Sequence, residues 1–233
     1  MTRHEIQLIQ YALHAQGIDP GPMDGLMGTR TRAAIAAYTA ANPPPPRRTA
    51  TATAYLKPLP SDELSTPQKI DMIGFLRNWS KNIARYNRVA ARSHVPAPLI
   101  AALHWREAGG YADLWHRYLH QGDMLGQPAL RVPSNIPVFQ EWEPAAVHAL
   151  ALKDSIRTRL GITERTTDLS LLCDYAEVYN GLGYRRKNLP SPYVLSGTAG
   201  YEKGKYIADG KFDINAVDRQ LGVLPMLRAC GLS

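Results

Sequence analysis

A glutamate closes the apolar stretch ALHWREAGG, residues 102–110. At 100° per residue, Glu107 projects about 20° from Ile100 and about 40° from Leu103, so it shares a face with apolar side chains. Burial and the negative end of the helix dipole both raise the pKa of such a carboxyl. A carboxylic acid that stays protonated near neutral pH can protonate a glycosidic oxygen. The alternative is a solvated glutamate with Arg106 beside it.

Side chains suited to binding a sugar follow this glutamate along the chain. Sugar recognition uses aromatic faces and neutral hydrogen-bonding groups, although a tyrosine at helical spacing also fits a protein core. The candidates for substrate binding are Tyr118, His120, Gln121, Tyr179, Asn180 and Tyr193. His104 and His120 have no third ligand at metal-site spacing, so the sequence predicts neither a metal nor another cofactor.

The hydrophobic pattern predicts a mainly α chain of the α+β type, with a small β-hairpin region. Residues 111–140 lose the helical period and are expected to form a small β-region, with a strand at 129–133. A second hairpin is expected at 206–213, with Asp209 and Gly210 at its turn. Helices are expected over 66–92, over 145–160, around 171–181 after a cap at Asp168, and over 214–230. A further helix, after the first of these, is expected to end at Glu107.

Two of these predicted helices carry more detailed expectations. Thr66 and Pro67 read as a cap and a first-turn proline, and Ile70, Ile73, Ile83 and Tyr86 are assigned to the apolar side of the first helix. In the last predicted helix Asp213 is the expected cap, and Pro225 is expected to bend it.

Four consecutive prolines divide the chain into three parts. Residues 43–66 contain these prolines and a Thr-Ala repeat, which favour an extended, semi-rigid linker. Residues 1–42 are too few for a deep active site and predict a small binding module. Residues 67–233 are enough for one catalytic domain.

The 233 residues carry a formal net charge of +7, and most of the excess lies in the second part. A basic surface favours an anionic partner or serves solubility. No signal peptide and no membrane span is predicted. Cys173 and Cys230 are expected to be buried free thiols rather than a disulfide.

The first part resembles the peptidoglycan-binding domain type 1 family. Its pattern D-G-x-x-G-x-x-T-x-x-A-hydrophobic-x-x-aromatic includes Ala34 and Ile35 here. The resemblance implies a three-helix module that holds cell-wall polymer, although a helical hairpin for protein docking is the alternative. The wall-binding positions that the resemblance carries over are Asp24, Gly25, Gly28, Thr31 and Tyr38.

The second part resembles the lysozyme superfamily, and within it goose-type lysozymes and lytic transglycosylases. The segment HWREAGG is similar to their helix-end E-S-x-G motif, with Ala108 in place of the usual serine, and Tyr179, Asn180 and Gly181 match their Y-N-A/G-G segment. Together the two parts look like a modular phage endolysin, with a lysozyme-like catalytic domain. This resemblance implies cleavage of the β-1,4 bond between N-acetylmuramic acid and N-acetylglucosamine, with Glu107 as the acid.

The sequence leaves the identity of a second catalytic group undecided. The resemblance points to Asp123, because lysozyme-like enzymes often place a water-positioning carboxylate in the β-region. Asp123 also fits a plain turn residue, and Glu141 and Glu143 are rivals. A lytic transglycosylase, which forms 1,6-anhydro ends, needs no second carboxylate. A non-catalytic wall-binding or structural phage protein is the alternative from another class.

The same resemblance implies the partner and the place of action. Bacterial peptidoglycan is the expected partner, with contact to an anionic membrane or lipopolysaccharide as a further possibility. No nucleic-acid motif is present, and a monomer is expected. The protein would be made in the host cytoplasm and would act in the periplasm or cell wall after release.

Overall fold

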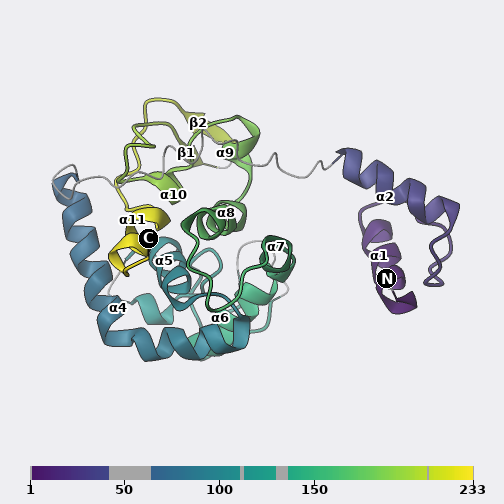
Figure 1. The fold of residues 1–233 in the computed structure, drawn as a ribbon, viewed down its shortest axis with the longest axis horizontal. Helices are drawn as coiled ribbons and strands as arrows, with labels where there is room; N and C mark the ends of the chain where they lie inside the picture. The colour runs from purple at the N-terminus through teal and green to yellow at the C-terminus, as the bar shows by residue number, and fades with distance from the viewer. Residues whose placement is uncertain (1, 42–63, 111–112, 130–135, 209, 233) are drawn as a thin grey trace. The chain divides into compact units, whose positions relative to one another are not determined.

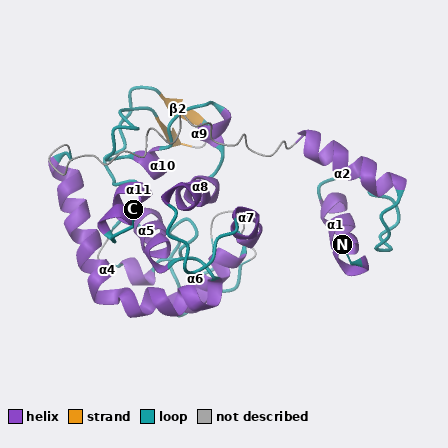
Figure 2. Ribbon diagram, in the orientation of Figure 1, coloured by secondary structure: helices purple, strands orange, loops and turns teal. Residues whose placement is uncertain are grey.

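The chain is mainly helical and carries one small antiparallel sheet (Figures 1 and 2). Contacts within the chain divide it into two compact units, Met1–Arg47 and Arg48–Ser233. The predicted mainly α class is confirmed at this level. The structure is a computed structural model that describes residues 2–41, 64–110, 113–129, 136–208 and 210–232, so the predicted linker lies almost wholly outside the described residues.

The first unit contains helices α1 (Arg3–Ala15) and α2 (Thr29–Ala41). Gln10 on α1 is buried and joins them: its side-chain amide donates to the Leu26 carbonyl oxygen (3.0 Å) and to the Thr31 hydroxyl (3.1 Å). Its side-chain oxygen accepts from the Gly25 N–H at 2.9 Å. Two helices lie within the described residues of this unit, so the third helix stays a prediction.

The residues carried over from the family pattern have different surroundings in this unit. Thr31 is buried and donates to the Pro20 carbonyl, while the Asp24 carboxylate accepts from the Leu26 N–H at 2.9 Å. Tyr38 is about 40% exposed. Asp24 and Thr31 therefore hold the connection between the helices, and Tyr38 has a surface that a polymer can reach.

The second unit begins with the long helix α4 (Thr66–Ser93). Its cap is Ser65 rather than Thr66, because Ser65 and Gln68 form a capping box. The assignment of apolar residues to its buried side was wrong in part. Tyr86 is fully buried, whereas Ile70, Ile73 and Ile83 are exposed.

Helix α5 (Ala97–Glu107) lies inside the second unit and packs against α4, α8 and the last helix α11. Its residues from Leu99 to Trp105 are all buried. Such a helix is apolar on every side, as expected for a central element. Glu107 therefore differs from the other residues of α5 by its position at the end of the helix, and not by lying on one apolar face.

The segment after α5 is less regular than predicted. It contains the 3₁₀ turn η3 (Leu114–His116) and a single antiparallel bridge between Arg117 and Met124. Within the described residues of 111–140 no regular strand forms. The turn between the bridged residues is tight, since Gln121 and Gly122 both have positive φ, and only one pair of residues bridges across it. Most of the strand predicted at 129–133 falls outside the described residues.

Several short helices complete this unit. The helix expected over 145–160 is broken at Leu152 and Lys153, which separate α6 from α7. The predicted cap of α8 is confirmed, because the Asp168 carboxylate accepts from the N–H groups of Ser170 and Leu171. The bounds are α6 (Trp142–Ala151), α7 (Asp154–Leu160), α8 (Leu169–Asn180), α9 (Gly183–Arg186) and α10 (Pro192–Leu195).

The hairpin predicted at 206–213 is confirmed as β1 (Lys205–Ala208) and β2 (Lys211–Asp213), although Asp209 lies outside the described residues. The helix predicted over 214–230 was wrong in length. Helix α11 covers only Val223–Ala229 and begins after Gly222. Pro225 falls in the first turn of α11, where its missing N–H is not needed, so it does not bend the helix.

Two remaining features bear on sequence expectations. Cys173 is buried and Cys230 is half-buried, and both are free thiols. Among the helices in the described ranges, none is both long and apolar enough to cross a bilayer.

The two family-pattern glycines Gly25 and Gly28 should respond differently to alanine. Gly25 has φ +73°, and an added Cβ would lie 2.4 Å from the Arg3 carbonyl oxygen, whereas nothing lies near Gly28. We expect Gly25→Ala to destabilise the first unit by more than 1 kcal/mol, because both the backbone and the contact are unfavourable. Hydrogen-exchange mass spectrometry of the full chain should then show faster exchange across 18–28. The matched control Gly28→Ala should exchange like the wild type, and equal exchange in both variants would contradict the expectation.

Candidate active site

Glu107 is the last residue of α5, and two glycines turn the chain away directly after it. Gly109 and Gly110 both have left-handed backbones, with φ of +68° and +65°. The Gly110 N–H donates to the Trp105 carbonyl at 3.1 Å, which completes a Schellman-type helix end. The predicted function of the double glycine, to end the helix at Glu107, is confirmed.

The Glu107 carboxyl accepts two hydrogen bonds from opposite parts of the second unit. The Tyr193 hydroxyl donates to Oε1 at 2.7 Å, and the Gln121 backbone N–H donates to Oε2 at 2.9 Å. The residue is partly exposed. Burial raises the pKa of Glu107, and the two donors only partly oppose that rise. The group is therefore held in place, and burial favours its protonated form relative to a glutamate in water.

The turn 118–124 brings the Gln121 amide to the end of α5. The Tyr118 N–H donates to the Asp123 carbonyl at 2.6 Å, which closes the turn. Gly122 at its tip has no room for a side chain, since a Cβ would lie 2.4 Å from the Glu107 carbonyl oxygen. Tyr179 on α8 holds the turn from the other side by donating to the Leu119 carbonyl at 3.3 Å.

A groove with a volume of about 460 Å³ is lined in part by Tyr193, whose hydroxyl contacts Glu107, although Glu107 itself is not among the lining residues. Two of the predicted substrate-binding residues, Asn180 and Tyr193, line it. Asn180 is exposed at the end of α8, and Tyr193 is buried except where it reaches the groove. The full lining is Arg106, Asn180, Gly181, Gly183, Tyr184, Pro192, Tyr193, Lys205, Tyr206, Asp218 and Gln220.

Arg106 organises one wall of this groove. Its guanidinium donates to the Asp218 carboxylate at 2.9 Å and to the Leu221 carbonyl at 3.1 Å. It also lies 4.9 Å from the centre of the Tyr193 ring. Arg106 is paired with Asp218 rather than with Glu107, so the alternative of a simple Arg106–Glu107 surface pair does not describe this site.

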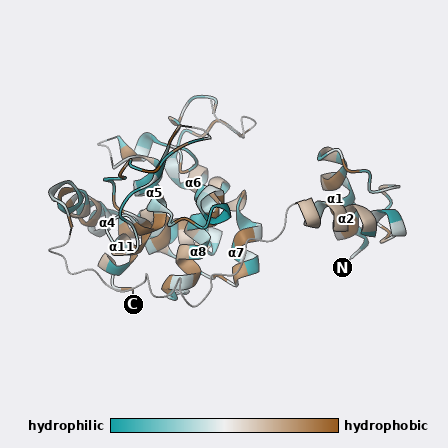
Figure 3. Cartoon of the chain, turned by 90° about the horizontal axis from the view of Figure 1, so that it is seen from above, coloured by the Kyte–Doolittle hydropathy of each residue, from teal (hydrophilic) through white to brown (hydrophobic). Residues whose placement is uncertain are grey.

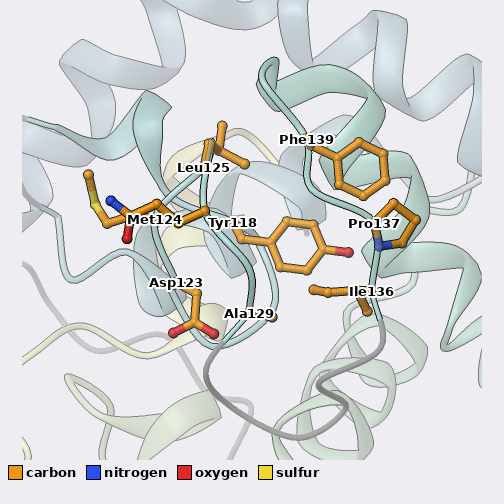
Figure 4. A pocket seen from close by; sticks show the side chains of 9 residues that line it. Tyr118, Asp123, Met124, Leu125, Ala129, Ile136, Pro137 and Phe139 are labelled. Carbon is orange, nitrogen blue, oxygen red and sulfur yellow. The ribbon is translucent and has the colours of Figure 1, made fainter.

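A second, smaller hollow lies beside the turn 118–124 (Figure 4). The Tyr118 ring lies in its middle and stacks on Phe139, with ring centres 6.0 Å apart. The Tyr118 hydroxyl is 2.5 Å from Nδ1 of His148, and burial raises the pKa of Tyr118 to about 12. Asp123 lines this hollow on the side opposite Phe139. Tyr118 and Asp123 therefore belong to a different hollow from Asn180 and Tyr193.

The other predicted substrate-binding residues have mixed positions. His120 and Gln121 are partly exposed next to Glu107, and their side chains are 3.3 Å apart at the nearest nitrogens. Tyr179 is buried and supports the turn 118–124. The structure thus brings Gln121 and Tyr193 to Glu107 directly, whereas Tyr179 acts through the turn that it holds.

The rival carboxylates are placed differently from Glu107. Glu143 accepts two hydrogen bonds from Arg85, at 2.8 and 2.7 Å, and one from Arg88. The bond from Arg85 lowers the pKa of Glu143 to about 2, which keeps it charged. Glu141 is exposed at the start of α6. Glu143 is therefore an ion-paired carboxylate and Glu141 is exposed to solvent, whereas burial raises the pKa of Glu107.

His104 is a core residue. Its Nε2 is 2.9 Å from the Leu114 carbonyl and its Nδ1 is 3.1 Å from the Tyr86 hydroxyl. Burial lowers the pKa of His104 to about 3, so it is neutral and both nitrogens have partners. Across the described ranges, no group of three or more histidine, cysteine or acidic side chains is arranged to hold a metal ion.

Most of the groove was missed from the sequence. Tyr184 lies on α9, Lys205 and Tyr206 are neighbours on β1, and Gln220 precedes α11, and no sequence spacing links these three places. Arg106 was the only one with a signal, as a charged residue inside a buried helix, since such charges need a partner.

The Tyr193 bond to Glu107 can be tested by titration. Removing the hydroxyl in Tyr193→Phe takes away a donor to the charged form, so the pKa of Glu107 should rise further. Carbon-13 NMR of the labelled glutamate carboxyls would follow this change. Tyr184→Phe is the matched control, because that buried groove tyrosine has no bond to Glu107 and its hydroxyl accepts from the Tyr206 N–H. An unchanged titration in Tyr193→Phe would contradict the assignment.

Comparison with known proteins identifies no relative of this chain. No protein-family model matches the chain, and neither a curated protein nor a solved structure matches it. The function must therefore be argued from the site itself.

Proposed function

We propose that the second unit is a peptidoglycan glycosidase that cleaves the β-1,4 bond between N-acetylmuramic acid and N-acetylglucosamine, with Glu107 as general acid. The observation that carries this proposal is the state of one carboxyl group. Glu107 is buried enough for a raised pKa, partly exposed, and held by Tyr193 and the Gln121 amide beside a groove. A general acid of a glycosidase needs these properties together.

In the proposed reaction Glu107 gives its proton to the oxygen of the leaving sugar. The carboxylate that results would be stabilised by the donors already in place, the Tyr193 hydroxyl and the Gln121 N–H. Because these donors do not have to move, proton transfer requires little rearrangement of the site. Burial raises the pKa of Tyr193 well above its usual range, so this hydroxyl stays a donor throughout.

The groove has the chemistry that a saccharide needs. Its volume of about 460 Å³ is within the common range for ligand sites. Tyr184 and Tyr206 supply aromatic surface and Asn180 supplies a neutral amide. Arg106 and Lys205 both lie near the Asp218 carboxylate, at 2.9 and 3.7 Å, so these three lining residues leave a net positive charge, which suits a substrate that carries the carboxylates of N-acetylmuramic acid and its peptide.

The first unit would hold the wall polymer while the second unit cuts it. Tyr38 is the residue of the family pattern with the clearest exposed surface, whereas Thr31 would act by supporting the fold of the module. In this proposal the protein acts on the cell wall after release from the cytoplasm, and its net charge of +7 favours approach to an anionic wall.

Two other functions remain as alternatives, and each has its own distinguishing result. A lytic transglycosylase would use Glu107 as acid and then as base, and would leave 1,6-anhydro ends. A non-catalytic wall-binding protein would bind polymer in the same groove without cleaving it. The raised pKa of Glu107 favours an enzyme, because a binding groove gains nothing from a buried acid.

The central test is Glu107→Gln. Glutamine keeps the shape of the side chain but has no proton to donate, so clearing of purified peptidoglycan should fall at least several hundredfold. Glu141→Gln is the matched control, since Glu141 is exposed and should retain near wild-type activity. Near-full activity of Glu107→Gln would rule out the proposed role.

The same variant should become more stable relative to the wild type as pH rises. The pKa of Glu107 in the folded state is raised above 4.5, so the wild type loses stability as pH rises through the interval up to the folded pKa. Glu107→Gln has no such loss, and its advantage should be about 1.4 kcal/mol for each unit of the pKa difference. Thermal unfolding should show no gap between the two proteins below pH 4. A gap that does not grow with pH would mean that Glu107 is not buried as an acid.

The reaction product should show whether Asp123 takes part. We expect hydrolysis, with reducing ends in the released disaccharide-peptides and a strong loss of activity in Asp123→Asn. The reason is that water attack needs a group that orients the water, and Asp123 ends the turn that contacts Glu107. Mass spectrometry distinguishes the products, because an anhydro end is lighter by one water. Anhydro ends released by an active Asp123→Asn variant would instead identify a lytic transglycosylase.

A further inference from the structure

One side of α4 is exposed along the outer edge of the second unit (Figure 1). At 100° per residue, the exposed residues of this side lie within about 140° of one another around the helix axis, and they span about 35 Å along it. We call this surface the outer α4 face. Its exposed residues include Lys69, Ile70, Ile73, Arg77, Ser80, Lys81, Ala84, Arg88 and Arg92.

The outer α4 face carries positive charge that the described residues balance only in part. The only acidic residue of α4 is Asp71, which turns inward to accept from the Trp105 ring N–H and the Leu221 N–H. Arg88 is paired with Glu143 of α6. In the described part of the chain, the remaining cationic side chains of this face have no hydrogen-bond or ion-pair partner: Lys69, Arg77, Lys81 and Arg92.

Two large apolar side chains lie among these charges. Ile70 is 65% exposed and Ile73 is 52% exposed, and both project between Lys69 and Arg77. Brown and teal residues alternate along α4 in Figure 3, in keeping with this mixture. Single exposed apolar residues are ordinary, but a pair one helical turn apart within a cationic stripe forms an amphipathic surface.

We propose that the outer α4 face docks on the surface of an anionic lipid bilayer. The unpaired cations complement the negative headgroups, and the two isoleucines enter the boundary between headgroups and acyl chains. A purely polar polyanion, such as a nucleic acid or a wall polymer, would use the charges but leave Ile70 and Ile73 exposed to water. An anionic bilayer accommodates both the cations and the isoleucines. This inference does not depend on the proposed glycosidase activity.

The test uses the full chain and two kinds of vesicle, neutral phosphatidylcholine and phosphatidylcholine with about one-third phosphatidylglycerol. We expect sedimentation with the anionic vesicles only. The variant Arg77→Gln/Lys81→Gln should bind them about 25-fold more weakly, or fivefold for each charge removed. The matched control Arg159→Gln/Lys211→Gln makes the same change in net charge at exposed positions outside α4, and should change binding less than twofold.

A second pair of measurements separates the bilayer from other anionic partners. In about 0.5 M salt the charges are screened, and the wild type should keep part of its vesicle binding through the isoleucines. Ile70→Ser/Ile73→Ser should lose that salt-resistant part. Equal losses in the α4 and control charge variants would overturn the proposal. It would also be overturned by equal binding to neutral vesicles, or by vesicle binding in Ile70→Ser/Ile73→Ser that matches the wild type at high salt.

Discussion

A carboxyl group held at the end of a buried helix is the constraint on which the rest of the second unit depends. Helix α5 is buried along most of its length, so its last residue is largely surrounded by protein and only partly exposed. A carboxyl there loses hydration and faces the negative end of the helix dipole, and each effect favours the protonated form. Tyr193 and the Gln121 amide donate to the carboxyl and orient it, and they only partly oppose the rise in the pKa of Glu107 that burial causes.

The backbone around Glu107 can be understood from the same constraint. Gly109 and Gly110 end the helix in a conformation that other residues adopt only with strain. Gly122 lets the following turn approach the Glu107 carbonyl more closely than any side chain would allow. Tyr179 then fixes that turn from α8. Glycines permit close approach of the two segments, and the buried tyrosine prevents them from separating.

The Arg106–Asp218 ion pair connects this helix end to the C-terminal part of the chain. Both side chains are largely buried, at 7% and 12% exposure, so breaking the pair would leave a charge without compensation. Through Asp218 and the Leu221 carbonyl, Arg106 holds the segment before α11 against α5 and forms a wall of the groove. These two neighbouring residues therefore have different roles: Arg106 forms part of the groove wall, and Glu107 lies next to that wall.

The sequence by itself determined the features that depend on local rules. The end of α5 at Glu107, the Asp168 cap and the 205–213 hairpin follow from glycine backbones, capping groups and alternation, which act within a few residues. The sequence also singled out the glutamate at that helix end. It failed for Ile70 and Ile73, because periodicity reports which residues share a side but not whether a neighbour covers that side.

Only the tertiary structure decided which side chains meet at Glu107 and which line the groove. Gln121, Tyr193 and Asp218 are separated from it by 14, 86 and about 110 residues, and no short-range pattern encodes such contacts. The same packing placed Tyr118 and Asp123 in a second hollow, and made His104 a neutral core residue. Charge state follows from burial, and burial is a property of the assembled fold rather than of any segment alone.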